Sequence, residues 1–168
     1  DEFYLSDGSD KLVTLVCEQG VQSQEWRMFT EFEMSPTMTA RAAALVREGT
    51  YVNLGVGIPT MVSNYLQNRD VILHAENGVL GYGEMVTGDS VDPDIYNAAG
   101  QFVSLKPGAS FFDSVTSFEM ARGGHIDTVI LGAYQVDQTG SVANWSTADA
   151  KRGGIGGAMD LLSGRGDL

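Results

Sequence analysis

Cysteine is almost absent from this sequence of 168 residues, in which Cys17 is the only one. A single thiol forms no internal disulfide and offers no thiolate cluster for zinc, so we expect no metal site and a reducing, cytoplasmic location. Long apolar runs are also missing, because a run such as residues 129–133 is far shorter than the roughly 20 residues of a membrane-spanning helix. No basic-then-apolar signal segment opens the chain. The sequence therefore predicts a soluble protein that is not exported.

Positive charge is scarce as well. The chain has 10 Lys and Arg residues against 22 Asp and Glu residues, which gives a formal net charge of -12 at pH 7. Such an acidic chain is repelled by nucleic acid and by anionic membrane surfaces unless basic residues gather locally. No basic cluster occurs in the sequence, so we expect neither nucleic acid nor membrane as a partner.

The length is that of one domain with its own core. Residues 1–37 differ in composition from the rest of the chain, because acidic and polar residues surround one strand-like run at residues 11–17. We interpret residues 1–37 as an N-terminal extension or displaced segment, and residues 38–168 as the domain itself.

From residue 38 onward, helical and strand patterns alternate. Helices are expected at residues 40–48 (with Thr39 as cap), from Pro59 to about residue 67, at residues 110–122 and from residue 157 to 162. Strands are expected at residues 51–54, 71–74, 102–105, 128–133 and 141–144. This alternation predicts an α/β fold with an open, largely parallel sheet and flanking helices.

Polar residues and glycines follow the ends of three predicted strands. Asn53 and a glycine loop end the first strand, Glu76 ends the second, and Asn144 ends the last. Because the carboxyl ends of parallel strands meet at one edge of a sheet and ligands bind there, we expect these segments to converge. The glycine loop is a weak match to a dinucleotide-binding loop, since it lacks the third glycine and no acid follows for a ribose.

Glu76 stands between an apolar run and the turn-forming pair Asn77-Gly78. A strand and a tight turn on its two sides hold a carboxylate rigidly and expose its tip. On the local sequence alone, a glutamate in a solvated turn is the alternative interpretation.

Seven segments resemble, in the same order, the sequence blocks of family I coenzyme A transferases, in the β (B) subunit of the 3-oxoacid group. They are VNLGVGIP at 52–59, LHAENGVLG at 73–81, PGASFF at 107–112, RGGHID at 122–127, LGA at 131–133, ANW at 143–145 and GIGGAMDL at 154–161. The resemblance covers about residues 38–163, and seven collinear blocks are far more specific than a single Glu-Asn-Gly.

The resemblance implies a catalytic role for Glu76, which attacks an acyl-CoA to form an acyl-glutamyl anhydride and then a glutamyl-CoA thioester. It implies that Asn53 provides a side-chain amide to the developing oxyanion. The further oxyanion and CoA-binding residues that it implies are Gly55, Gly57, Asn77, Gly78, Gly156, Gly157 and Ala158. No permanently bound cofactor is implied, since coenzyme A is a substrate.

The resemblance also implies a partner, the α (A) subunit of the CoA-transferase, in a heterodimer or heterotetramer. The implied substrates are an acyl-CoA of the succinyl or acetyl type and a 3-oxo acid of the acetoacetate or 3-oxoadipate type. Two alternatives stay open at this stage: a non-catalytic CoA-binding or regulatory subunit, and an acyl-CoA hydrolase on the same scaffold.

The chain departs from the family pattern in three places. Ala75 stands where the family often has Ser, and residues 146–153 differ from the usual loop. Family members continue beyond the block at 154–161 with another strand and helix, so we expect the C-terminal part of the domain to be missing. We therefore predict that residues 11–18 pack against the vacant sheet edge.

Several ring-bearing residues receive structural roles. The chemistry above needs no proton transfer, so we predict structural roles for His125 and His74, the latter in packing or hydrogen bonding. Trp145 is expected to pack, and the three phenylalanines 111, 112 and 118 are expected in the core.

Overall fold

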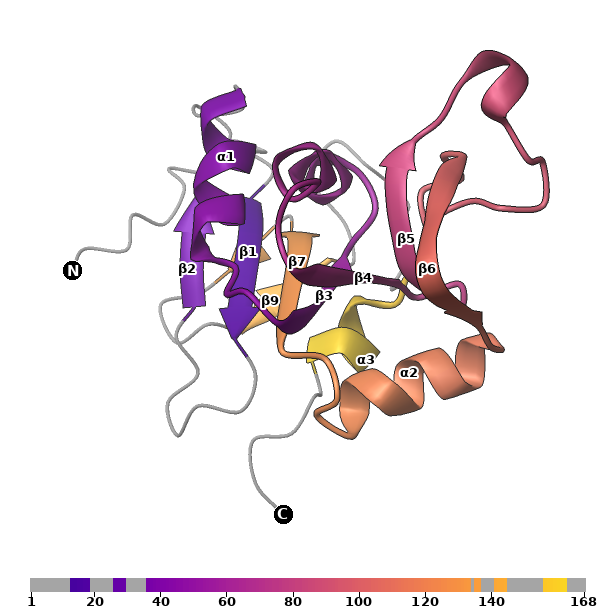
Figure 1. Ribbon diagram of the computed structural model, residues 1–168. Helices are drawn as coiled ribbons and strands as arrows, with labels where there is room; N and C mark the ends of the chain where they lie inside the picture. Colours follow the sequence, from indigo (N-terminus) through magenta and orange to yellow (C-terminus); the bar gives the residue numbers. More distant parts are fainter. Residues whose placement is uncertain are drawn as a thin grey trace, which may run out of the picture.

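A seven-stranded sheet organises the chain (Figure 1). The structure, a computed structural model, describes residues 13–18, 26–29, 36–133, 135–136, 141–144 and 156–162. The strand order is β2-β1-β7-β3-β4-β5-β6. The strands span Val13–Glu18 (β1), Trp26–Phe29 (β2), Thr50–Leu54 (β3), Val71–Ala75 (β4), Val79–Met85 (β5), Val103–Phe111 (β6) and Thr128–Ala133 (β7).

The predicted α/β architecture is confirmed, and the parallel pairing is confined to the centre of the sheet. Strand β3 pairs parallel with β4 on one side and with β7 on the other. Antiparallel strands extend this centre in both directions, through β1 and β2 beyond β7 and through β5 and β6 beyond β4. The described sheet is therefore mixed around a parallel core.

Helices cover both faces of the sheet. Helix α1 (Pro36–Leu45) and the 3-10 helix η2 (Ile58–Tyr65) share one apolar cluster with Val52, Leu73 and Ile130. Helices α2 (Ser114–Arg122) and α3 (Ala158–Leu162) share a second cluster with Val129 and Leu131, and they lie on the opposite side in Figure 1. Since successive strand residues point to opposite faces, β7 contributes to both clusters.

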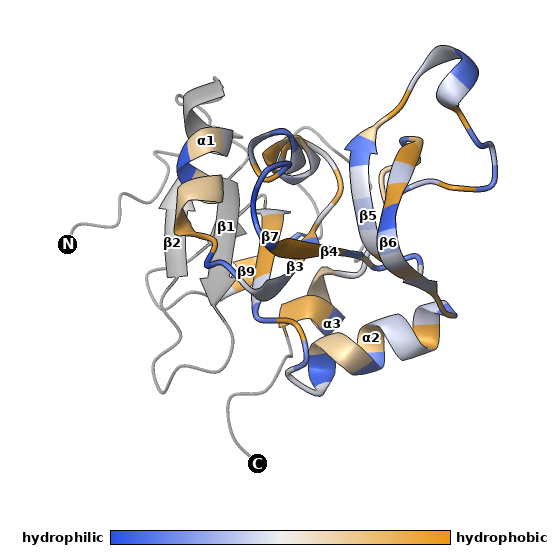
Figure 2. Ribbon diagram, viewed as in Figure 1, coloured by the Kyte–Doolittle hydropathy of each residue, from blue (hydrophilic) through white to orange (hydrophobic). Residues whose placement is uncertain are grey.

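This burial on two faces explains the hydropathy pattern. Five of the six residues of β7 are buried, and Figure 2 shows β7 largely in the orange of hydrophobic residues. A strand covered on both faces reads as a continuous apolar run, which is why residues 128–133 are a strong strand signal. The remaining elements are a short 3-10 helix, Gly88–Ser90 (η3), and a hairpin of Gln135–Val136 (β8) and Val142–Ala143 (β9).

The helix boundaries differ from the sequence-based ones for identifiable reasons. Helix α1 begins at Pro36 rather than at residue 40, so Thr39 lies inside it and is not its cap. Helix α2 begins at Ser114 and not at residue 110, because Asp113 is its N-cap and accepts a hydrogen bond from the Thr116 N–H. The residues before it extend β6 to Phe111, and β5 was not predicted at all.

The prediction for the N-terminal strand is confirmed where the structure describes it. Residues Val13–Glu18 pair antiparallel with β7 along their whole length. This strand is followed by β2 on its outer side, so it is not itself the last strand of the sheet. Residues 11 and 12, the turn at 137–140, Trp145 and the loop at 146–153 lie outside the described residues.

The described residues contain neither a membrane-spanning helix nor a metal-binding cluster. In the part of the chain that the structure describes, no helix has the length and apolarity needed to cross a membrane. In that same part, no group of three or more His, Cys, Asp or Glu side chains is placed to hold a metal ion.

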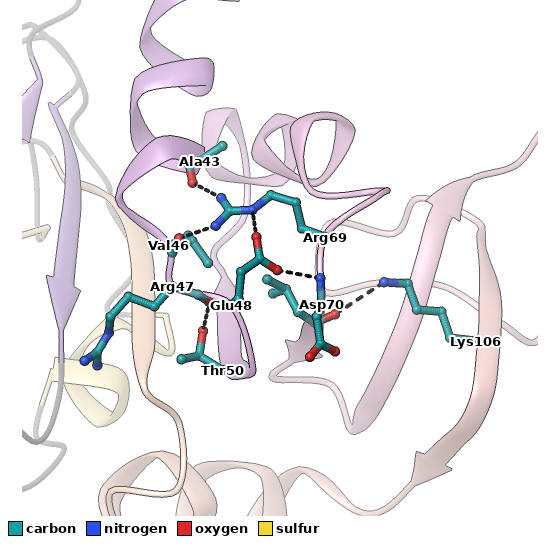
Figure 3. A network of polar contacts seen from close by, with 9 residues as sticks. Ala43, Val46, Arg47, Glu48, Thr50, Arg69, Asp70 and Lys106 are labelled. Atoms are coloured by element: carbon teal, nitrogen blue, oxygen red, sulfur yellow. Dashed lines mark hydrogen bonds and ion pairs between the residues drawn. The ribbon is translucent and has the colours of Figure 1, made fainter.

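Arg69 ties the end of α1 to the start of β4 (Figure 3). Its guanidinium donates to the carbonyl oxygens of Ala43 at 2.6 Å and Val46 at 2.5 Å, and its Nε donates to Glu48 at 2.5 Å. The other carboxylate oxygen of Glu48 accepts the Asp70 N–H at 2.6 Å. Arg69 thus binds one carbonyl in the last turn of α1 and one just beyond it, at the helix end where carbonyls lack partners within the helix.

Replacing Arg69 should therefore destabilise the fold. We expect Arg69→Met, which keeps much of the apolar stem, to lower the free energy of unfolding by about 2 kcal/mol, since hydrogen bonds from a charged donor are lost. The matched control is Arg47→Met, because Arg47 is exposed and a surface substitution should stay within about 0.5 kcal/mol. Urea unfolding of both variants measures the difference, and equal effects would contradict this role for Arg69.

Candidate active site

Glu76 lies in the tight turn of a β-hairpin. Ala75 pairs with Val79, so Glu76, Asn77 and Gly78 form the loop between β4 and β5. The Gly78 N–H donates to the Ala75 carbonyl at 3.0 Å, and the Gly78 carbonyl accepts from the Phe112 N–H at 3.0 Å. The turn is thus held both from within and by the segment that leads into α2.

Gly78 is required at its position by backbone conformation and by space. Its φ is 108°, which side chains on L-residues rarely adopt. A Cβ added there would lie 1.9 Å from the Phe112 carbonyl oxygen, which belongs to the backbone and has little room to shift. The Asn77 side chain steadies the same turn, because its Nδ2 donates to the Tyr96 carbonyl at 2.9 Å.

The Glu76 carboxylate faces Gly157, just before α3. A Cβ added to Gly157 would lie 2.5 Å from Glu76 Oε2, 2.9 Å from Glu76 Cδ and 3.0 Å from Phe118 Cε1. Two segments about eighty positions apart in sequence therefore meet at this carboxylate. Only a glycine leaves room for the carboxylate where it stands.

The carboxylate is half-buried, and no charged side chain of the described residues pairs with it. Among the described residues, no hydrogen bond or ion pair to Glu76 occurs. Burial raises the pKa of the Glu76 carboxyl above its ordinary value. An unpaired, partly desolvated carboxylate in a rigid turn suits a nucleophile.

A buried polar chain lies beside this turn. Asn53 Nδ2 is 2.9 Å from His74 Nδ1, and His74 Nε2 is 3.0 Å from Ser117 Oγ. All three side chains are fully buried. Ser117 Oγ also lies 3.4 Å from the Ala75 carbonyl oxygen, next to Glu76. Burial lowers the pKa of His74 to about 4, so its imidazole is neutral near pH 7.

The predicted structural role of His74 is confirmed by these bonds and by its stacking on Phe112, with ring centroids 6.0 Å apart. The core assignment of the phenylalanines was wrong for Phe111, which is 61% exposed at the end of β6. Phe118 packs against the second apolar cluster as expected and also lies beside Gly157, while the half-buried Phe112 stacks on His74.

The predicted convergence at one sheet edge is confirmed. Strands β3 and β4 end side by side and are followed by Gly55 and Glu76, while β7 continues to Ala133; Asn144 Nδ2 donates to the Gly132 carbonyl near the end of β7 at 3.1 Å. Asn53 contacts His74 rather than Glu76 among the described residues, so its oxyanion role stays a prediction.

The remaining predicted glycines occupy different settings. Gly55 is buried, and its N–H donates to the Ile130 carbonyl at 2.8 Å, with no room for a Cβ beside Leu131. Gly57 is exposed with φ 92° and starts η2, where its carbonyl accepts from Thr60. Gly156, with φ 57°, and Ala158 flank Gly157. The roles of these residues in binding CoA stay predictions.

Ser117 was missed by the sequence analysis. It becomes recognisable only once α2 is known to start at Ser114, because Ser117 and Ala121 then share a buried helix face at i and i+4. A lone polar residue on an otherwise apolar helix face is the signal that marks it.

Comparison with known proteins agrees with this geometry. The family model for coenzyme A transferase matches residues 36–166. The β (B) subunit of the 3-oxoadipate CoA-transferase of Pseudomonas putida is 49% identical over 128 residues, covering 76% of this chain and 60% of that protein. The β (B) subunit of the succinyl-CoA:3-ketoacid coenzyme A transferase of Helicobacter pylori is 47% identical over 131 residues, 78% of this chain and 63% of that protein.

A human relative shows the same similarity within a longer protein. The mitochondrial succinyl-CoA:3-ketoacid coenzyme A transferase 2 is 50% identical over 124 residues, which are 73% of this chain and 24% of that protein. The chain thus aligns with about three fifths of the length of the bacterial proteins. The family match covers most of the chain and includes the hairpin of Glu76 and the turn at Gly157, and the chain therefore belongs to the coenzyme A transferase family.

Proposed function

We propose that this chain is the catalytic β subunit of a 3-oxoacid CoA-transferase. It would move CoA from an acyl-CoA of the succinyl or acetyl type to a 3-oxo acid of the acetoacetate or 3-oxoadipate type. The observation that carries the proposal is the Glu76 carboxylate, held in a rigid turn, free of charged neighbours among the described residues, and in close contact with Gly157. The names of the related proteins support the substrate classes.

The chemistry follows from the reactivity of a carboxylate. The ionised Glu76 oxygen attacks the thioester carbonyl, and the CoA thiolate leaves as a mixed anhydride forms. The thiolate then attacks the Glu76 carbonyl, so that a glutamyl-CoA thioester forms and the first acid departs as its carboxylate. A second carboxylic acid takes up CoA by the reverse sequence, and Glu76 is regenerated.

A glutamate suits this carrier role for an energetic reason. A mixed anhydride is at least as reactive as a thioester, so the free energy of the thioester bond is retained through the cycle. An ester on serine would be too stable to pass CoA onward. In this proposal coenzyme A is a substrate, and the transfer needs no permanently bound cofactor.

Oxyanions develop in each step and need fixed hydrogen-bond donors. We assign this role to the Asn53 amide and to the backbone N–H groups of Gly156, Gly157 and Ala158. The contact between Gly157 and Glu76 supports the second group. The first is supported by the hydrogen bond of Asn53 to His74, which precedes Glu76 by two residues.

The partner in this proposal is the α subunit of the CoA-transferase, in a heterodimer or heterotetramer. Coenzyme A is anionic and the chain carries a formal net charge of -12. Cationic groups that bind the nucleotide part of CoA would then come largely from the α subunit. The single cysteine fits a reducing compartment, and we propose a cytoplasmic location.

The pH dependence of the reaction should report the burial of Glu76. The nucleophile is the ionised form, and burial raises its pKa, so the rate should rise with pH through a value above the ordinary glutamate pKa of about 4.3. Single-turnover release of the first acid from an acyl-CoA, which accompanies formation of the CoA adduct on Glu76, measures this limb when it is followed across pH 4 to 8. A limb at or below the ordinary value would contradict the described burial of the nucleophile.

Acceptor dependence tests the proposed reaction. The complex with the α subunit is incubated with succinyl-CoA, with and without acetoacetate or 3-oxoadipate, and both free CoA and the new acyl-CoA are measured. Transfer predicts new acyl-CoA only with an acceptor, and less than one equivalent of lasting CoA release without one. Continuous CoA release without acceptor would instead identify a hydrolase, and no reaction at all would contradict a catalytic role.

A further inference from the structure

Within the part of the chain that the structure describes, one polar atom of the Asn53 side chain has no hydrogen-bond partner. Asn53 is fully buried, its Nδ2 lies 2.9 Å from His74 Nδ1, and its Oδ1 is buried with no hydrogen-bond donor. A buried amide oxygen without a hydrogen-bond partner is unusual, because buried polar atoms are nearly always paired. This unsatisfied position of the amide would be paired either by a ligand atom or after the amide adopts another orientation.

The ring of His74 allows the Asn53 amide two arrangements, and in the first of them Asn53 Nδ2 also makes a long contact of 3.5 Å to the His74 carbonyl oxygen. With its proton on Nε2, His74 donates to Ser117 Oγ and accepts from Asn53 Nδ2, which leaves Oδ1 idle. With its proton on Nδ1, His74 donates to Asn53 Oδ1 after the amide has turned by half a rotation, and Nε2 accepts from the Ser117 hydroxyl. The idle atom is then Nδ2, a donor.

The proposed reaction distinguishes the two arrangements. The groups that react with Glu76 present oxygen atoms, first as the thioester carbonyl and then as the oxyanion of each tetrahedral intermediate, and both accept hydrogen bonds. If Oδ1 faced these oxygen atoms it would repel them, whereas Nδ2 in the same position would donate a hydrogen bond to them. Asn53 and His74 are directly opposite each other in adjacent strands, and Glu76 follows His74 by two residues, so they belong to the same corner of the sheet.

We propose that His74 and Ser117 are positioning residues that select the orientation of the Asn53 amide. Ser117 donates its hydroxyl proton to Nε2 of His74, which keeps the imidazole proton on Nδ1, and Nδ1–H donates to Oδ1 of Asn53. Nδ2 of Asn53 is thereby turned toward the reacting oxygen. This assignment rests on the proposed function, since it presumes that Asn53 serves an oxyanion at Glu76.

The distances at Ser117 favour this direction of donation. Its hydroxyl has two acceptors within reach, the His74 Nε2 at 3.0 Å and the Ala75 carbonyl at 3.4 Å. Because hydrogen bonds between oxygen and an acceptor weaken beyond about 3.0 Å, the longer contact to the carbonyl is the weaker of the two. The Ser117 hydroxyl is therefore expected to donate its hydrogen bond to His74 Nε2.

The burial of the chain supports a neutral imidazole with a fixed tautomer. His74 and Ser117 are both fully buried, and Phe112 covers the ring. Burial also lowers the pKa of His74 to about 4, so the imidazole carries one proton near neutral pH. Which nitrogen carries that proton is then decided by Asn53 and Ser117 alone among the described contacts of the ring nitrogens.

Nitrogen NMR of the complex reads the tautomer directly. The chain has two histidines, and His125 is exposed, so it is a reference within the same spectrum. In the histidine-labelled chain with an unlabelled α subunit plus succinyl-CoA at pH 7, we expect His74 to be protonated on Nδ1 and unprotonated on Nε2. A proton that stays on Nε2 with succinyl-CoA bound would overturn the proposal.

Ser117→Ala tests the same point through the reaction. Without the hydroxyl donor, the Nδ1 tautomer loses its support, so we expect formation of the CoA adduct on Glu76 to slow about tenfold at saturating succinyl-CoA, with a mixed tautomer. Ser117→Thr keeps a hydroxyl and should restore the tautomer. Ser63→Ala is the matched control, because Ser63 is also buried but bonds to Thr60 under the opposite face.

These measurements distinguish a failure of the proposed function from a failure of the positioning role of Ser117. A wild-type complex that forms no adduct on Glu76 would overturn the proposed function. A wild-type complex that forms the adduct, while Ser117→Ala matches Ser63→Ala in rate and in tautomer, would overturn the positioning role alone. A slower Ser117→Ala with a changed tautomer, beside an unchanged Ser63→Ala, supports it.

Discussion

Replacement of Glu76 by Gln should abolish CoA transfer while leaving the fold intact. The amide has nearly the shape of the carboxylate but lacks a nucleophilic oxygen, so neither the anhydride nor the thioester can form. We expect the transfer rate to fall by at least about 10³-fold, since loss of a covalent nucleophile removes the whole reaction path.

The same variant should be at least as stable as the wild type at pH 7. The folded pKa of Glu76 is raised by burial, so ionisation of Glu76 opposes folding. That cost is absent below the pKa of the unfolded chain and is fully present above the pKa of the folded chain. The neutral Gln avoids it, and thermal unfolding at pH 7 and pH 4 measures the change. Appreciable transfer by Glu76→Gln would contradict the nucleophilic role, and unfolding of the variant would contradict the described setting of the side chain.

Replacement of Gly157 by Ala should give nearly as large a loss by displacement alone. The new Cβ would lie 2.5 Å from Glu76 Oε2, and the carboxylate is the far end of a flexible side chain, so it moves more readily than the backbone. Gly157 does not have a positive φ, so the backbone accepts alanine. We expect a rate loss on the order of 100-fold, because a nucleophile displaced by about 1 Å loses its alignment.

The control for Gly157→Ala shows the opposite behaviour. Gly88 has φ 64° with no atom within 4 Å of an added Cβ, so Gly88→Ala strains the backbone far from Glu76. It should reduce stability by about 1 kcal/mol and leave the transfer rate unchanged. Equal rates for Gly157→Ala and the wild type would show that the carboxylate does not work from the position described here.

Much of the central sheet could be predicted because its signals are local. Strands β3, β4 and β7 are short apolar runs bounded by glycine or turn residues, and they were expected within one or two residues of their observed bounds. Strand β5 was missed because Gly81 and Gly83 interrupt its pattern, although the Asn77-Gly78 pair that precedes it is a strong hairpin signal.

The extension of β6 to Phe111 was missed for a related reason. Residues 110–122 show a helical pattern that continues upstream of Asp113, and only the hydrogen bonds of the folded chain show that Asp113 caps the helix. Strand pairing with β5, through Val79 and Phe111, then decides the conformation of the residues before it. Tertiary pairing overrides local propensity at such boundaries.

The candidate site could be predicted as a set of residues but not as a network. Glu76 and Gly157 are in recognisable motifs, and the structure brings them into contact. The hydrogen bond between His74 and Ser117 joins residues 43 positions apart, on a strand and a helix, and neither local sequence predicts it. Pairings of that kind depend on the register of a helix against a sheet, which is fixed by packing of the whole core.

The central claim is that the Glu76 carboxyl group carries CoA between two acids. Its most direct test is peptide-level mass spectrometry of the complex after brief incubation with succinyl-CoA and no acceptor. The account predicts a CoA adduct in thioester linkage on the peptide that contains Glu76, absent from Glu76→Gln and discharged when acetoacetate is added. An adduct on a different residue, or turnover of acyl-CoA with Glu76 never modified, would contradict it.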